Sequence, residues 1–211
     1  IRTTEGGYVS GAEQHSQSLV SWFVHIPGIK VVEPATPADA MGLLRAALRD
    51  GNPVIIFEHR YLYSLVDDVP DDPDFIIPLG KANIVREGND CTVIATALQL
   101  YKAKEAAEIL ARKGIEIELI DPRTIDPLDE ETILKSVKKT GRAVIVHETW
   151  TKGGYGAEIA AVIADRAINY LNGPVKRVGA KNVPIPFSPV LENYVLPQVE
   201  DIVRAVEETF E

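Results

Sequence analysis

Four histidines are the side chains of this sequence best suited to proton transfer: His15, His25, His59 and His147. His15 lies in a polar stretch, QHSQ at residues 14–17, and three glycines lie between residues 6 and 11. A histidine side chain gains or loses a proton near neutral pH, so one on a glycine-rich loop is an acid–base candidate. A surface or loop-tethering histidine fits the same spacing. The other three lie in or beside apolar segments, where a structural role is more common.

Two further motifs have the groups needed to hold an ion. Gly153-Gly154-Tyr155-Gly156 precedes a predicted helix, and the free N–H groups at a helix N-terminus can bind an anion. A tight turn between strand and helix is the alternative that the spacing favours. Asp50-Gly51-Asn52 follows another predicted helix and offers oxygen atoms to a monovalent cation, although Gly and Asn also end helices routinely. No zinc-hydrolase motif, nucleophile elbow or phosphate-binding loop is present.

The composition is that of an ordinary globular protein. Of 211 residues, 45% are hydrophobic and 25% are charged. The single cysteine, Cys91, excludes an intrachain disulfide and a four-cysteine zinc site, and is typical of a reducing compartment. With 22 basic and 31 acidic residues the net charge is −9, which disfavours nucleic acid and anionic lipid as partners. No apolar run approaches the roughly 20 residues of a membrane span, and residues 1–5 do not resemble a signal peptide.

An acidic, proline-rich segment divides the chain. Residues 67–74 contain five aspartates and two prolines, a combination that neither a helix nor an inner strand accommodates. We therefore predict a solvated linker over residues 67–77. It separates residues 1–66 from residues 78–211.

Both parts alternate short apolar strands with amphipathic helices, the pattern of a mainly parallel sheet covered by helices on both faces. In the first part, strands at 29–32 and 54–57 enclose a helix that begins after Thr36, its N-cap, and ends at Asp50; a short helix is predicted at 18–23. In the second part we predict strands at 91–97, 115–120, 143–147 and 175–178, and helices at 100–113, 128–139, 157–171 and 199–210. The fold class is α/β.

Seven motifs, in this order, carry a family resemblance: GAEQHSQS (11–18), PGIKVVEP (27–34), DGNPVIIFEH (50–59), IDPRTIDPLD (120–129), KTGR (139–142), GGYGAEI (153–159) and GPVKRV (173–178). Together they resemble the beta subunit of the thiamine-diphosphate-dependent 2-oxo acid dehydrogenases. These are the decarboxylase components of pyruvate, branched-chain 2-oxo acid and acetoin dehydrogenase complexes. The resemblance covers nearly the whole chain.

The resemblance implies a fold and a set of site residues. Residues 1–66 correspond to the second half of a pyrimidine-type thiamine-binding domain, and residues 78–211 to a transketolase C-terminal-type, three-layer αβα domain. His15 matches the family's active-site histidine, which assists proton transfer as the acyl group passes to a lipoyl group. Ala47, Asp50 and Asn52 match a potassium-binding loop of some relatives, in which position 47 contributes its carbonyl oxygen.

The activity implied is oxidative decarboxylation of a 2-oxo acid with reductive acylation of a lipoyl group. The implied partners are an alpha subunit and a second beta subunit in a heterotetramer, and a dihydrolipoyl acyltransferase core. The location implied is the cytoplasm or an organelle matrix. The motifs do not indicate which 2-oxo acid is the substrate. A C-terminal section of a transketolase or deoxyxylulose-phosphate synthase, and a non-catalytic docking domain, are the alternatives.

The resemblance also implies an incomplete active site. In the family, thiamine diphosphate and magnesium are held mainly by the alpha subunit, through a Gly-Asp-Gly motif that this sequence lacks. The glutamate that activates the cofactor lies in the first half of the pyrimidine-type domain, which does not match any segment here. We therefore expect a truncated, nicked or split beta subunit, inactive by itself, with exposed sheet edges and an exposed apolar face.

Overall fold

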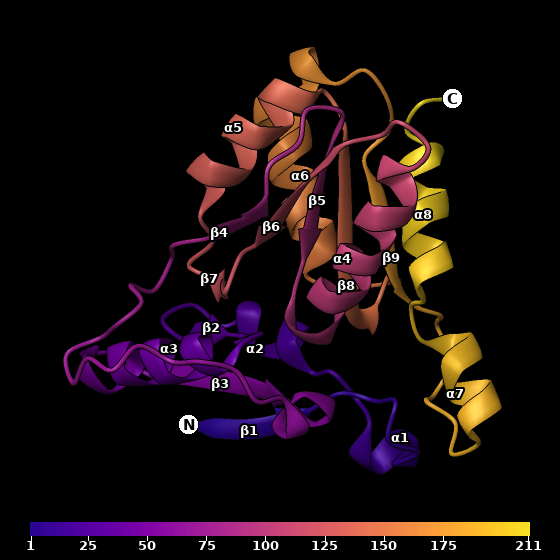
Figure 1. Ribbon diagram of the computed structural model, residues 1–211. Coiled ribbons are helices and arrows are strands. Elements are labelled where there is room, and N and C mark those ends of the chain that lie inside the picture. The colour runs from indigo at the N-terminus through magenta and orange to yellow at the C-terminus, as the bar shows by residue number, and fades with distance from the viewer.

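The two parts of the chain each build a β-sheet, and helices pack against both (Figure 1). The computed structural model describes all residues from Ile1 to Glu211. We refer to residues 1–66 as the N-terminal part and to residues 78–211 as the C-terminal part. None of the helices has the length and apolar character needed to cross a membrane.

The first sheet has the strand order β1-β3-β2-β7. Its strands β1 (Arg2–Glu5), β3 (Val54–His59) and β2 (Lys30–Val32) run parallel, whereas β7 (Thr124–Asp126) pairs antiparallel with β2. The helices of the N-terminal part are α1 (Ala12–His15), α2 (Val20–Val24), α3 (Pro37–Arg49) and a 3₁₀ helix (Arg60–Ser64). Since β7 belongs to the C-terminal part, the first sheet includes a strand from each part of the chain.

The second sheet has the order β4-β6-β5-β8-β9. Its parallel strands are β5 (Cys91–Ala95), β6 (Ile117–Asp121), β8 (Ala143–Trp150) and β9 (Lys176–Ala180), and β4 (Asn83–Arg86) is an antiparallel edge strand. The helices α4 (Ala97–Ala111) and α8 (Val199–Glu207) cover one face, and α5 (Glu130–Thr140) and α6 (Gly156–Ala167) cover the other (Figure 1). A further helix, α7 (Pro189–Val195), precedes α8, and a 3₁₀ turn (Ile168–Tyr170) follows α6. The predicted α/β class and three-layer arrangement are confirmed.

Local sequence explains where the main elements begin and end. The side-chain oxygen of Thr36 accepts the N–H of Asp39 at 3.0 Å, so α3 begins where the N-cap was predicted. Gly141 ends α5 in the left-handed conformation, with φ of 71°. Several predicted bounds differ from the structure by a few residues. For example, β8 continues beyond His147, because Trp150 still pairs with β9, and α4 already begins at Ala97.

One hydrophobic core spans the two parts. Val31, Ile55 and Phe57 of the first sheet lie in the same cluster as Ile120 and Ile159 of the C-terminal part. The opposite face of the first sheet packs on α3 and on the segment that follows the acidic residues, through the buried side chains Val32, Leu43, Val54, Ile56 and Ile77. The two parts are therefore packed together rather than joined only by the linker.

The acidic segment 67–74 forms neither helix nor strand, as predicted, and its aspartates are exposed. It is nevertheless attached to α3. The Arg45 guanidinium donates to the carbonyl oxygens of Asp72 at 2.9 Å and Phe75 at 3.2 Å. The linker therefore follows a defined path along the N-terminal part.

Candidate active site

His15 is the last residue of α1, and its side chain is exposed to solvent. The helix has only four residues and no side-chain cap at Gly11, its N-cap position. An exposed imidazole can reach a reactant held by another molecule or chain. The position of His15 is therefore suitable for proton transfer, provided that something fixes so short a helix.

The loop that leads to His15 has an unusual backbone. Positive φ angles occur at Gly6 (92°), Tyr8 (64°), Ser10 (55°) and Ala12 (54°), alternating with residues of ordinary φ. Left-handed conformations of residues other than glycine cost on the order of 1–3 kcal/mol each, and persist only where the surrounding structure imposes them. Gly6 has no alternative, because a Cβ there would lie 2.3 Å from the His59 ring. The loop is therefore strained next to the candidate catalytic group.

The C-terminal part holds this loop at three points. Gly7 N–H donates to the Glu148 carboxylate at 2.6 Å, and Ser10 N–H donates to the Glu192 carboxylate at 3.0 Å. The Tyr8 hydroxyl donates to the carbonyl oxygen of Pro197 at 2.7 Å. A backbone whose residues alternate in this way turns successive N–H groups toward one side, where they bind anions. Two carboxylates from distant segments occupy that side of the loop.

Glu148 also binds His59, which connects β8 to β3. The distance from His59 Nε2 to Glu148 Oε2 is 2.6 Å, and both side chains are buried. Tyr61 N–H donates to His59 Nδ1, so Nε2 carries the proton that the carboxylate accepts. Burial alone would raise the pKa of Glu148, but the imidazole and the Gly7 N–H hold it below its ordinary value. Glu148 is thus a carboxylate anion at the junction of both sheets.

A buried pair of carboxyl groups, Glu5 and Glu33, also lies between the sheets. Glu5 ends β1 and Glu33 follows β2, and both side chains are 3% exposed. Both Glu5 oxygens and one Glu33 oxygen are buried without a hydrogen-bond partner, and the hydroxyl groups of Ser18 and Tyr155 lie nearby. Burial raises the pKa of Glu33 to about 7 and that of Glu5 well above its ordinary value. The pair therefore holds a proton near neutral pH. Sequence analysis missed it, although an acidic residue directly after an apolar strand was the available signal.

The three residues of the predicted potassium loop lie together at the C-terminal end of α3, away from α1 (Figure 1). Asp50 N–H donates to the Ala47 carbonyl oxygen at 3.3 Å. One Asp50 oxygen accepts the Asn52 backbone and side-chain N–H groups, both at 2.9 Å, and the other forms an ion pair with Lys30. These hydrogen bonds and the ammonium group lower the pKa of Asp50 to about 2. A potassium ion at this carboxylate would compete with the Lys30 ammonium.

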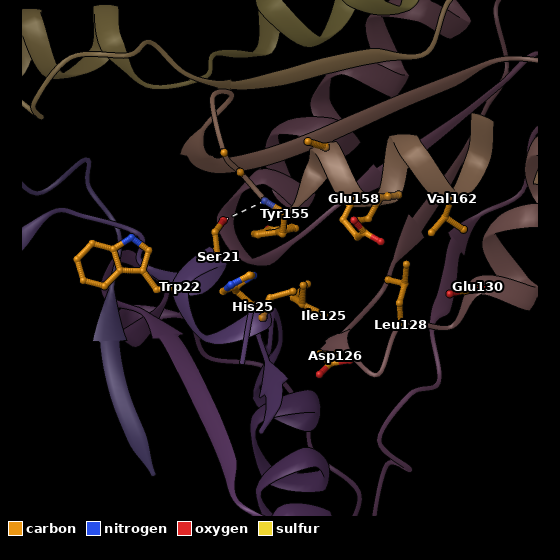
Figure 2. A pocket seen from close by; sticks show the side chains of 15 residues that line it. Ser21, Trp22, His25, Ile125, Asp126, Leu128, Glu130, Tyr155, Glu158 and Val162 are labelled. Atoms are coloured by element: carbon orange, nitrogen blue, oxygen red, sulfur yellow. Dashed lines mark hydrogen bonds between the residues drawn. The ribbon is translucent and has the colours of Figure 1, made fainter. Parts of the chain in front are cut away.

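The glycine motif at residues 153–156 forms the predicted tight turn into α6. Tyr155 N–H already donates to the Ser21 hydroxyl oxygen at 2.9 Å, the bond drawn in Figure 2. A Cβ on Gly156 would lie 2.4 Å from the His147 ring, so the turn packs on that imidazole. Burial lowers the pKa of His147 to about 4 and keeps it neutral. These contacts are structural, and the turn shows no anion site.

A cavity with a volume of about 830 Å³ lies between α2, β7 and α6 (Figure 2). Apolar side chains such as Ile125 and Leu128 line it together with three carboxylates, Asp126, Glu130 and Glu158. His15 does not line this cavity. Nowhere in the chain do three His, Cys, Asp or Glu side chains come close enough together to hold a metal ion.

The two mainly parallel sheets and their helices place the chain among the α/β proteins, and comparisons with known proteins identify the family. Residues 80–202 match the transketolase C-terminal domain, and residues 1–65 match the transketolase pyrimidine binding domain. The chain belongs to the transketolase C-terminal domain family, and its homologues are beta subunits of 2-oxo acid dehydrogenase complexes. The family resemblance expected from the motifs is confirmed.

Particular relatives show how far the similarity extends. The chain is 47% identical to the acetoin:2,6-dichlorophenolindophenol oxidoreductase subunit beta of Bacillus subtilis, over 96% of this chain and 59% of that protein. It is 45% identical to the pyruvate dehydrogenase E1 component subunit beta of Rhizobium meliloti, over 98% of this chain and 45% of that protein. The chain thus spans about half the length of these relatives.

A solved structure described as a split gene transketolase, inactive beta4 tetramer, has the same fold. The TM-score is 0.81 at 29% sequence identity, over 99% of this chain and 65% of that chain. The two beta subunits described above are more similar to this chain in sequence, at 47% and 45% identity.

Proposed function

We propose that this chain forms part of the beta subunit of a thiamine-diphosphate-dependent 2-oxo acid dehydrogenase. Assembled with an alpha subunit, it takes part in oxidative decarboxylation of a 2-oxo acid and in reductive acylation of a lipoyl group. The observation that carries the proposal is His15, exposed at the end of a strained loop in a chain whose homologues are such beta subunits.

The residues present fit one wall of such a site. This sequence lacks the Gly-Asp-Gly motif that binds magnesium diphosphate in the family, and we assign those ligands mainly to the alpha subunit. Thiamine diphosphate, when bound, supplies the carbanion chemistry of the family. His15 moves a proton as the acyl group passes to the lipoyl sulfur. Its exposure leaves room for a reactant that a partner chain presents.

The assembly proposed is a heterotetramer with two alpha and two beta subunits, which delivers acyl groups to a dihydrolipoyl acyltransferase core. The resemblance of the chain to a beta subunit described as a tetramer supports self-association of this fold. We place the complex in the cytoplasm or an organelle matrix. We retain Ala47, Asp50 and Asn52 as a candidate potassium site, in competition with Lys30.

Substitution of His15 tests the proposal. In a complex reconstituted with an alpha subunit, His15→Ala should lower lipoyl-dependent turnover by about 100-fold, the usual scale for loss of a proton-transfer group. The melting temperature should barely change, because the side chain is exposed. His25→Ala, another exposed histidine, is the matched control and should retain activity. Near-normal turnover of His15→Ala would refute the assignment.

A further inference from the structure

The orientation of His15 depends on contacts from outside its own segment. The loop from Gly6 to Gly11 belongs to no helix or strand, and α1 has no side-chain cap. Tyr8, Ser10 and Ala12 all have left-handed φ angles that L-residues rarely adopt. Without an external anchor, Ser10 would relax toward a negative φ, and the direction of α1 would change with it.

Of the residues that hold the loop, Glu192 on α7 contacts the position nearest to His15, which is Ser10. The Glu192 side chain is 2% exposed, and its Oε2 atom accepts the Ser10 N–H at 3.0 Å. Its Oε1 atom is buried without a hydrogen-bond partner, and a Cβ on Gly7 would lie 3.3 Å from it. A buried carboxylate with an unsatisfied oxygen is unfavourable for stability. Its presence against the loop therefore calls for a role other than stabilising the fold.

We propose that Glu192 is a positioning residue for His15, a proposal that rests on the function assigned to His15 above. The carboxylate binds the N–H of Ser10, holds that residue in its left-handed conformation and thereby fixes α1. Glu148 anchors the same loop at Gly7, nearer to β1, so loss of Glu192 frees the end of the loop next to His15 and leaves the β1 end in place. A displacement of about 1 Å at a catalytic group can lower a rate by about two orders of magnitude.

The proposal predicts effects on kcat that a purely structural role of Glu192 would not produce. Glu192→Gln retains an oxygen that accepts the Ser10 N–H, so it should keep activity within about threefold, whereas Glu192→Ala should lower kcat by about tenfold or more with little change in KM. Ser10→Gly adopts the observed φ without strain, so it should restore part of the activity in the Glu192→Ala background. Glu200→Ala, an exposed acid on the adjacent helix, is the control.

The deciding experiment combines Glu192→Ala with His15→Ala in the reconstituted complex and measures kcat for lipoyl-dependent turnover. If Glu192 acts through His15, the double variant is no slower than His15→Ala alone. The proposal is overturned if Glu192→Ala is fully active, if its loss multiplies that of His15→Ala, or if Ser10→Gly restores nothing. Should Glu192→Ala fail to fold, Glu192→Gln decides, since a tenfold or larger loss of kcat in that variant overturns the proposal. If His15→Ala alone is active, the proposed role of His15 fails instead, and the two failures are distinguishable.

Discussion

Replacement of Glu33 by glutamine should make the chain more stable at alkaline pH and leave it unchanged at acid pH. Glu33 and Glu5 are both buried between the two sheets, and neither Glu5 oxygen has a hydrogen-bond partner. A glutamine has the shape of a protonated glutamate and keeps a donor toward Glu5. The substitution therefore keeps the side chain at position 33 neutral at every pH, while Glu5 titrates in both proteins.

The magnitude follows from the pKa of Glu33, which burial raises from an ordinary 4.5 to about 7. A change of this size corresponds to about 3 kcal/mol. Because the folded pKa lies above the unfolded one, the folded chain binds more protons between these values, and its stability falls as pH rises through that window. The contribution is fully present below the unfolded pKa and is lost as pH passes the folded pKa. Burial also raises the pKa of Asp121 to about 7. Its titration changes the stability of both proteins equally and so does not contribute to the difference between them.

Urea unfolding followed by tryptophan fluorescence measures this difference. At about pH 5 the two proteins should have similar free energies of unfolding, and at about pH 8 the Glu33→Gln variant should be more stable by about 3 kcal/mol. Glu200→Gln, at an exposed position, should show no pH-dependent difference. A difference that does not vary with pH, or a variant that is less stable at alkaline pH, would show that the pair does not hold a proton.

Two further predictions concern ligands. Potassium should raise the melting temperature of Lys30→Gln more than that of the unchanged chain, because the competing ammonium is gone, and sodium should raise it less. Asp50→Ala should abolish the effect. Equal responses of the unchanged chain, Lys30→Gln and Asp50→Ala would show that the loop is an ordinary helix end without a potassium site. Titration calorimetry of the chain with thiamine diphosphate and magnesium should detect no micromolar binding, since the sequence lacks the Gly-Asp-Gly motif and its net charge is −9. Micromolar binding would refute the assignment of those ligands to an alpha subunit.

Sequence periodicity predicted the long elements well because each contains its own signals. The N-cap at Thr36 and the left-handed Gly141 are local features, and they set the ends of α3 and α5. Three short strands, β1, β4 and β7, were not predicted, although the equally short β2 was. β1, β4 and β7 have only three or four residues each, and what makes them strands is pairing with segments far along the chain. In particular, nothing local indicates that β7 joins the first sheet.

The candidate site was predictable to the same extent. A glycine-rich segment and a family motif identified His15, because both are written in adjacent residues. Glu148 and Glu192 were not identified, since they contact the loop from 141 and 182 residues away. Each accepts a hydrogen bond from a backbone N–H group, and nearly every residue type at position 7 or 10 has such a group. Residues that act on the backbone of another segment leave no motif at the place where they act.

The arrangement of the two sheets explains why a part of the chain without a proposed catalytic group matters to the site. The parallel strands β1 and β3 of the first sheet end at Glu5 and His59, and β8 of the second sheet carries Glu148 near its own carboxyl end. In open α/β sheets these ends are where ligands bind. Here they face each other, and the loop to His15 leaves from between them. Strain in that loop is tolerated because the shared core and the carboxylates of the C-terminal part hold it. The C-terminal part therefore acts on the proposed chemistry through the conformation of the backbone, without touching a reactant.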